Sequence, residues 1–143
     1  MASLKDLLVD SKLYYAKVGM SVLDVAKMMD THNIGAVPVL DNKYNLKGLF
    51  SERDLLRRCI SRELDLKSTK IEEVMTKKVV VIEAHDTPEY CLSILLQENI
   101  RHIPVIENTE LVGFLSIRDL MMYDNNAKEE KIDMLNFYIQ YNG

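Results

Sequence analysis

The sequence has few cysteines, no long apolar segment and no excess of basic residues. Its two cysteines, Cys59 and Cys91, have no metal-ligand spacing and lie in apolar stretches. We therefore expect buried free thiols in a reducing cytoplasm. No apolar run approaches the roughly 20 residues that span a bilayer, and the N-terminus does not resemble a signal peptide. A net charge of −4 without a basic run argues against nucleic acid as the main partner.

The sequence also lacks the motifs of common catalytic sites. It has no nucleophile elbow, no Walker loop and no paired Cys or His ligand set, so it predicts neither an enzyme nor a metal site. Apolar residues make up 48% and charged residues 28%, a composition typical of a globular protein. The 143 residues allow one ordinary domain or two small units that share a core.

What the sequence does contain is one stretch that occurs twice, at residues 33–40 with 48–55 and at residues 99–106 with 113–120. Pro38 and Pro104 are 66 positions apart, whereas Ser51 and Ser116 are 65 apart, so the first copy has one extra turn residue. Self-similarity on this scale indicates that each copy is one structural unit.

Each repeat is predicted to form a strand, a helix, two strands and a second helix. Residues that commonly cap helices mark the expected helix starts, at Ser3, Ser21, Ser51, Thr69, Thr87 and Ser116. Strand-forming segments are expected at Leu13–Val18, Ala36–Leu40, Leu46–Phe50, Val79–Ile82, Ile103–Ile106 and Leu111–Leu115. Because proline has no amide donor, we place the strand with Pro38 at a sheet edge or beside a bulge.

These elements predict an α+β fold of two units related by a pseudo-twofold axis, with a cleft between them. The expected domains are residues 1–66 with a short N-terminal helix, residues 67–125, and a C-terminal helix in residues 126–143. The apolar face of that last helix, with Ile132 and Leu135, is expected to dock on the module. Units of about 60 residues bury little apolar surface alone, and their helices are apolar on more than one face. We therefore expect a homodimer.

The paired residues Ser51 with Asp54, and Ser116 with Asp119, fall where a strand is predicted to meet a helix. A Ser-x-x-Asp sequence is a helix capping box, which is the simpler interpretation. The alternative is a nucleotide site, in which the helix start and the serine hold a phosphate and the aspartate accepts hydrogen bonds from ribose hydroxyls. A cap needs no arginine, yet each copy has one between the serine and the aspartate. This favours binding.

The repeated pattern resembles a pair of cystathionine β-synthase (CBS) domains, the tandem called a Bateman module. The signature is a Pro-Val strand, a polar turn and then Gly-apolar-apolar-Ser-x-x-Asp, present in both copies and in register over residues 10–123. The Ser-x-Arg-Asp form, the Val74-Met75-Thr76 step and the expected C-terminal helix resemble stand-alone two-domain members from bacteria and organelles rather than modules of an enzyme or channel. The resemblance implies a regulatory module that binds AMP, ADP, ATP, NAD(H) or, alternatively, S-adenosylmethionine. It also implies dimerisation through the helices into a flat disc and signalling to a partner protein.

The resemblance carries over to two sites. The Asp119 site would use Ser116, Arg118, Asp119, Arg101, His102, Ser11, Tyr14, Tyr15, Gly35 and Ala36. The Asp54 site would use Ser51, Arg53, Asp54, Thr76, Val80, Ile100 and Arg101. Tyr14 and Tyr15 stand where the family usually has small apolar residues, so a ring would either fill the adenine slot or stack on the base. Arg and His side chains that are exposed at the start of a strand are more often solvated than functional. Arg101 and His102 are therefore either solvated or in contact with a phosphate.

Three functions therefore compete. The leading hypothesis is a cytoplasmic sensor that binds an adenine nucleotide without a metal. The second hypothesis, a structural adaptor, is favoured if the Ser-x-Arg-Asp side chains serve only as helix caps. An enzyme such as a nucleotide hydrolase needs a base or metal ligands near a phosphate, and the acidic pairs of the sequence lie on predicted solvated faces.

Overall fold

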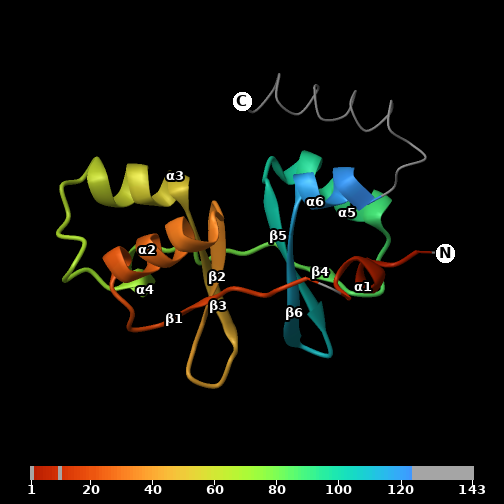
Figure 1. The fold of residues 1–143 in the computed structure, drawn as a ribbon, viewed down its shortest axis with the longest axis horizontal. Coiled ribbons are helices and arrows are strands. Elements are labelled where there is room, and N and C mark those ends of the chain that lie inside the picture. The colour runs from red at the N-terminus through yellow and green to blue at the C-terminus, as the bar shows by residue number, and fades with distance from the viewer. Residues whose placement is uncertain (1, 10, 124–143) are drawn as a thin grey trace. The chain divides into compact units, whose positions relative to one another are not determined.

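The computed structural model of the protein describes residues 2–9 and 11–123. These residues form two compact units (Figure 1). The first-repeat unit consists of residues 13–80 and 108–111. The second-repeat unit consists of the described residues among 1–12, 81–107 and 112–123. The α+β class predicted from the sequence is confirmed, because each unit contains one three-stranded sheet and helices.

The first-repeat unit has the predicted order of strand, helix, strand, strand and helix. Its elements are β1 (Ala16–Lys17), α2 (Val22–His32), β2 (Ala36–Leu40), β3 (Leu46–Ser51), α3 (Glu52–Asp54), η1 (Leu55–Ile60) and α4 (Ile71–Val74). The sheet order is β1-β2-β3, with β1 parallel to β2 and β2 antiparallel to β3. The sheet therefore brings the start of β2 next to the end of β3, where Ala36 pairs with Ser51.

Helix α2 begins after Ser21, as predicted, and ends at Asn33. The Ser21 hydroxyl accepts a hydrogen bond from the Asp24 amide at 3.1 Å, and Asn33 ends the helix in the left-handed conformation with φ 53°. Val22, Val25 and Met29 lie on one helix face and are buried in the core of the unit. Burial of this face against the sheet supplies the stability that a helix of this length lacks alone.

Pro38 does not lie on an edge strand, contrary to the edge alternative predicted from the sequence, because β2 is the central strand. Its partner Leu49 exchanges backbone hydrogen bonds with Thr76, so the amide position of Pro38 faces the β1 side. Pairing with β1 starts only at Val39, which leaves the missing donor without consequence. A register shift between Val39 and Leu40 agrees with the bulge alternative.

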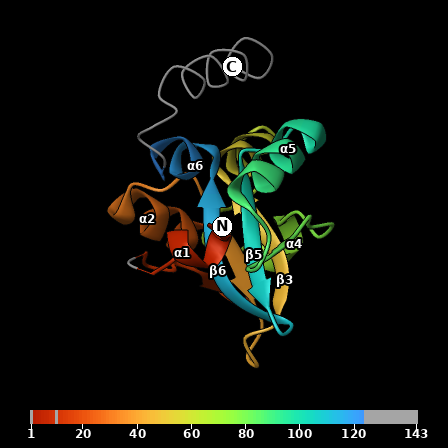
Figure 2. The same ribbon diagram turned by 90° about the vertical axis from the view of Figure 1, so that its right-hand side faces the viewer.

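The second-repeat unit contains β4 (Ile82–Glu83), α5 (Pro88–Glu98), β5 (His102–Glu107), β6 (Glu110–Ser116), α6 (Ile117–Tyr123) and also α1 (Leu4–Leu7). The sheet order β4-β5-β6 repeats that of the first unit. Thr87 caps α5 through the Tyr90 amide at 3.1 Å, and Asn99 ends it at φ 57°. Helices α5 and α6 pack against each other (Figure 2).

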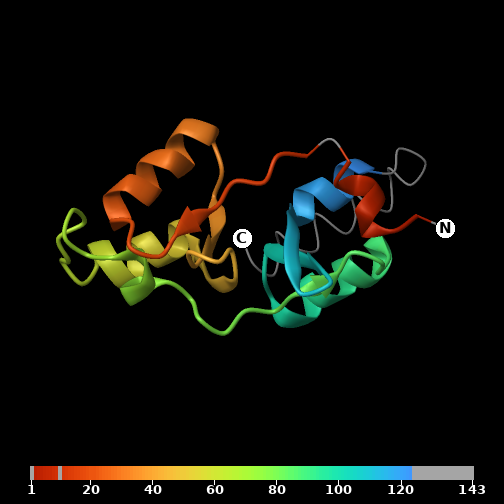
Figure 3. The same cartoon turned by 90° about the horizontal axis from the view of Figure 1, so that it is seen from below.

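Two short helices pack on the repeat that does not contain them in sequence. Leu4 and Lys5 of α1 donate backbone hydrogen bonds to Asp86 and Ala84 at 2.9 and 3.0 Å, so α1 lies in the second-repeat unit (Figure 3). The matching contact joins Ile71 of α4 to the carbonyl of Met20 at 2.9 Å. The compact units thus follow packing rather than repeat order, and the boundaries at residues 66 and 125 stay predictions.

Several element boundaries differ from those predicted. Strands β1 and β4 have two residues each, because only those residues pair with β2 and β5. Thr69 does not cap α4, since its hydroxyl donates to the Asp65 carbonyl and Glu73 instead accepts from the Lys70 amide. The helix expected from Ser51 to about Ser61 divides into α3 and the π-helical η1, in which Ser61 donates to Leu56, five residues back. The predicted C-terminal helix lies outside the described residues.

Both cysteines are buried and free, as predicted. In the described part of the chain, every helix is too short or too polar to cross a bilayer.

Candidate functional site

The Asp54 half-site is defined here as Ser51, Asp54, Arg58 and Thr76, and all four residues belong to the first-repeat unit. Strand β3 ends at Ser51 and α3 begins at the next residue. The Ser51 amide donates to Asp54 Oδ2 at 3.1 Å, and the Asp54 amide donates to Ser51 Oγ at 3.2 Å. The capping box predicted from the sequence is therefore present.

The Asp54 carboxylate has further partners that a helix cap does not require. The Thr76 hydroxyl lies 3.4 Å from both carboxylate oxygens, and Arg58 Nε lies 3.6 Å from Oδ1. The Asp54 side chain is only 14% exposed, whereas that of Arg58 is 41% exposed. A carboxylate offers about four acceptor positions, of which the cap uses one and the Thr76 and Arg58 side chains approach others.

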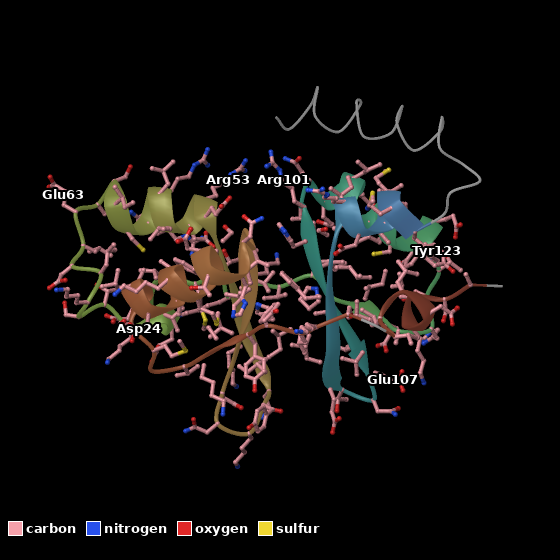
Figure 4. The ribbon with its side chains drawn as sticks, in the orientation of Figure 1. Asp24, Arg53, Glu63, Arg101, Glu107 and Tyr123 are labelled. Atoms are coloured by element: carbon pink, nitrogen blue, oxygen red, sulfur yellow. The ribbon has the colours of Figure 1, made fainter. Side chains whose placement is uncertain are left out.

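Gly35 and Ala36 lie beside this half-site. The Glu52 amide donates to the Gly35 carbonyl at 2.9 Å, and Ala36 pairs with Ser51 across the sheet. A Cβ at Gly35 would lie 3.3 Å from Glu52 Oε2, so the absence of a side chain leaves the backbone open next to the start of α3. Arg53 is exposed on the first turn of this helix (Figure 4).

Tyr14 and Tyr15 have ring partners in the same unit. Tyr14 stacks on His32 with ring centroids 4.0 Å apart, and Tyr15 meets Tyr44 edge-on at 6.1 Å. Lys17 Nζ lies 4.4 Å from the Tyr44 ring centroid. Val80 is half-buried near the end of this unit. The assignment of both tyrosines, Gly35 and Ala36 to a site with Asp119 stays a prediction.

The Asp119 half-site is defined as Arg101, His102, Ser116 and Asp119 of the second-repeat unit. The Ser116 amide donates to Asp119 Oδ2 at 2.7 Å, and the Asp119 amide donates to Ser116 Oγ at 3.1 Å. The Ile117 amide donates to the Arg101 carbonyl at 3.0 Å, as Glu52 does to Gly35 in the first repeat. The structure therefore brings these four predicted residues together, while Arg118 is exposed on the first turn of α6.

The His102 ring lies against an aromatic side chain and near two charged groups. Its ring stacks on Phe114 with centroids 5.5 Å apart. Burial lowers the pKa of His102, the Asp119 carboxylate opposes this shift, and the Arg101 charge reinforces it. At neutral pH the imidazole is therefore mainly uncharged, and it can act as a hydrogen-bond donor or acceptor rather than as a fixed positive charge.

Sequence reasoning missed Arg58. Its Nη1 donates to the carbonyls of Val74 and Met75 at 3.3 and 3.0 Å, in addition to the contact of Nε with Asp54. The available signal was the spacing of four residues between an acid and a base, which places both side chains on one helix face. Among the described residues, no group of three or more His, Cys, Asp or Glu side chains could hold a metal ion.

Comparison with known proteins gives related chains and structures. The chain is 33% identical over 124 residues to the mitochondrial CBS domain-containing protein CBSX3 of Arabidopsis thaliana, covering 84% of this chain and 60% of that protein. It also matches the structure of a signal-transduction protein with CBS domains from Burkholderia ambifaria, with a TM-score of 0.77 and 30% identity. That match covers 83% of this chain and 90% of the other.

The fold also matches that of a more distant protein crystallised with ligands. The CBS domain pair of protein MJ0100, in complex with 5′-methylthioadenosine and S-adenosyl-L-methionine, is 23% identical with a TM-score of 0.74. The match covers 84% of this chain and 93% of that chain. Two segments of the present chain, residues 4–61 and 71–126, each match the CBS domain itself. The chain therefore belongs to the CBS domain family and contains a pair of these domains.

Proposed function

We propose that this protein is a regulatory module that binds an adenine nucleotide and changes, on binding, how it presents itself to a partner protein. The candidate ligands are AMP, ADP, ATP and NAD(H), with S-adenosylmethionine as the alternative. The adenosyl compounds bound by the CBS pair of MJ0100 support the adenosine part of this proposal. We further propose that it acts without catalysis as a cytoplasmic homodimer.

The observation that carries the proposal is the environment of Asp54. A capping box needs only Ser51 and Asp54, yet the carboxylate is also approached by Thr76 from a segment 22 residues away. A mostly buried carboxylate that polar neighbours hold in place suits a hydroxyl donor such as those of a ribose. The exposed Arg53 is available next to it for a phosphate.

One observation favours the adaptor alternative. In both repeats the serine and aspartate engage each other as reciprocal caps, so each aspartate already accepts a hydrogen bond from a backbone amide. If capping is their whole role, the module binds no nucleotide and only joins proteins. The two functions therefore differ in whether the aspartates bind a ligand in addition to capping.

Calorimetric titration separates these functions. AMP, ATP, NADH and S-adenosylmethionine are titrated into the protein after bound ligand has been stripped, and into Asp54→Ala and Asp119→Ala. Each hydrogen bond from a ribose hydroxyl to a carboxylate contributes about 1.5–3 kcal/mol, so loss of one aspartate weakens its site at least about tenfold. A ligand at 100 times its dissociation constant stabilises the folded wild type by about 2.7 kcal/mol.

The outcomes are distinct. Folded variants that bind with wild-type affinity would show that the aspartates are caps and that the site assignment is wrong. If the stripped wild type binds none of the four compounds, the adaptor function replaces the sensor. Native mass spectrometry of the freshly purified protein gives an independent check, because a bound nucleotide adds its own mass.

A further inference from the structure

Arg58 links two segments of the first-repeat unit through one side chain. Its Nε faces the Asp54 carboxylate, and its Nη1 donates to the carbonyls of Val74 and Met75 at the end of α4. Helix-terminal carbonyls lack partners within the helix, and a planar guanidinium can reach a carboxylate and carbonyls together. The side chain therefore ties the carboxylate to the segment that precedes Thr76.

Thr76 completes this connection. Its hydroxyl lies within 3.4 Å of both oxygens of Asp54, and its backbone exchanges hydrogen bonds with Leu49 of β3 at 2.8 and 2.9 Å. The carboxylate is thus contacted from the helix side by Arg58 and from the α4 side by Thr76. Groups that contact a binding residue from two directions restrict its rotamers, so less conformational entropy is lost when a ligand binds.

At the two matching positions among the described residues, the second repeat has neither an arginine nor a threonine. With the 65-residue offset that relates Asp54 to Asp119, the counterpart of Arg58 is Tyr123. The counterpart of Thr76 follows from packing, because a Cβ at Gly48 would meet Met75 and a Cβ at the matching Gly113 would meet Leu8. Leu8 therefore corresponds to Met75, and the next residue, Val9, corresponds to Thr76. Tyr123 carries no positive charge and the side chain of Val9 has no donor. Within the described residues, Asp119 forms no ion pair and is exposed.

We infer that Arg58 is the positioning residue of the Asp54 half-site and, with Thr76, makes this half-site the tighter of the two for adenosine ligands. The inference rests on the proposed function and adds that the two half-sites differ in affinity. Arg58 itself does not contact the ligand. It acts by holding the carboxylate in the orientation that accepts the ribose hydroxyls.

A purely structural role, in which Arg58 only caps α4, makes a different prediction. That role would change stability but not the preference for a ribose over a deoxyribose, because the preference comes from the carboxylate. Arg58→Gln separates the two roles, since the amide of glutamine can still donate to the carbonyls of α4 but has no charge for Asp54. Arg57→Gln is the matched control, because Arg57 is the exposed neighbour whose side chain forms no hydrogen bond or ion pair with the described residues.

The experiment titrates AMP and 2′-deoxy-AMP into stripped full-length protein that carries Asp119→Ala, so that the Asp54 half-site is measured. Arg58→Gln should weaken AMP by about tenfold, the loss expected for one charge-assisted hydrogen bond that is no longer aligned. It should also reduce the ratio of AMP to 2′-deoxy-AMP affinity toward one. Arg57→Gln should change neither value. In the opposite background, with Asp54→Ala, AMP should bind more weakly than to Asp119→Ala.

Several results would overturn the inference. If Arg58→Gln weakens both nucleotides equally and keeps their ratio, Arg58 is only a cap. If Asp54→Ala weakens AMP but Arg58→Gln does not, the proposed function stands and the positioning role falls. If the stripped wild type binds no AMP, the proposed function and the positioning role are both refuted for this nucleotide. Should Arg58→Gln fail to fold, Thr76→Val with Thr76→Ser as its rescue tests the same ratio, and an unchanged ratio in Thr76→Val refutes the inference.

Discussion

Replacement of Gly48 by alanine should destabilise the first-repeat unit and disturb the Asp54 half-site. A Cβ at this position would lie 2.6 Å from Met75 Sδ and 2.7 Å from the Thr76 carbonyl oxygen. The methionine can move, but the Thr76 carbonyl accepts from the Leu49 amide at 2.9 Å. The carbonyl can retreat only if this bond and its partner, from the Thr76 amide to Leu49, are lengthened or broken.

The magnitude follows from these contacts. Overpacking by one methyl group costs about 1–3 kcal/mol, and each backbone hydrogen bond that is lost costs about 1 kcal/mol. Alanine also restricts the unfolded chain and returns about 0.4–1 kcal/mol. Movement of the Thr76 carbonyl would relieve the steric overlap but weaken its hydrogen bonds, so the two costs do not add in full. We expect Gly48→Ala to lower the free energy of unfolding by about 2 kcal/mol.

Urea unfolding followed by circular dichroism measures this loss, with Gly35→Ala in the same unit as the control. A Cβ at Gly35 would meet only the end of the Glu52 side chain, at 3.3 Å, so its change should stay within about 0.5 kcal/mol. A displaced Thr76 should also weaken AMP binding at the Asp54 half-site. Equal stability of Gly48→Ala and Gly35→Ala would refute the reasoning.

Three further predictions concern particular side chains. Burial raises the pKa of Cys91 to about 12, so its thiol should not react with a disulfide reagent near pH 8 until the protein is unfolded; rapid labelling of the native protein would contradict this. Burial lowers the pKa of His102 below its usual 6.5, so protonation favours the unfolded state. Stability should therefore fall as the pH drops below about 6.5, and His102→Gln should reduce this fall in urea unfolding; an equal fall in both proteins would count against it. Leu56 and Ile60 are 57% and 54% exposed on η1, so aspartate at both positions should convert the proposed homodimer to monomer in sedimentation without loss of helix; a wild-type monomer at micromolar concentration would exclude the dimer.

Local chemistry accounts for what could be predicted from the sequence. Asn33 and Asn99 tolerate the left-handed conformation, and each ends a helix. Ser51 and Ser116 form the predicted capping boxes, because this geometry needs only residues three positions apart. The repeat spacing, with the motif it carries, was enough to indicate the pair of CBS domains.

Tertiary structure decided the features that depend on contacts distant in the sequence. Pro38 lies on a central strand because β1 begins to pair one residue later, and strand length is set by the partner. Helices α1 and α4 pack on the opposite repeats, which no local pattern encodes. The sequence placed Asp54 and Arg58 one helical turn apart, but only the fold brings the carbonyls of α4 to the same guanidinium. Backbone groups have the same chemistry at every residue, so which carbonyl a side chain meets is settled by packing alone.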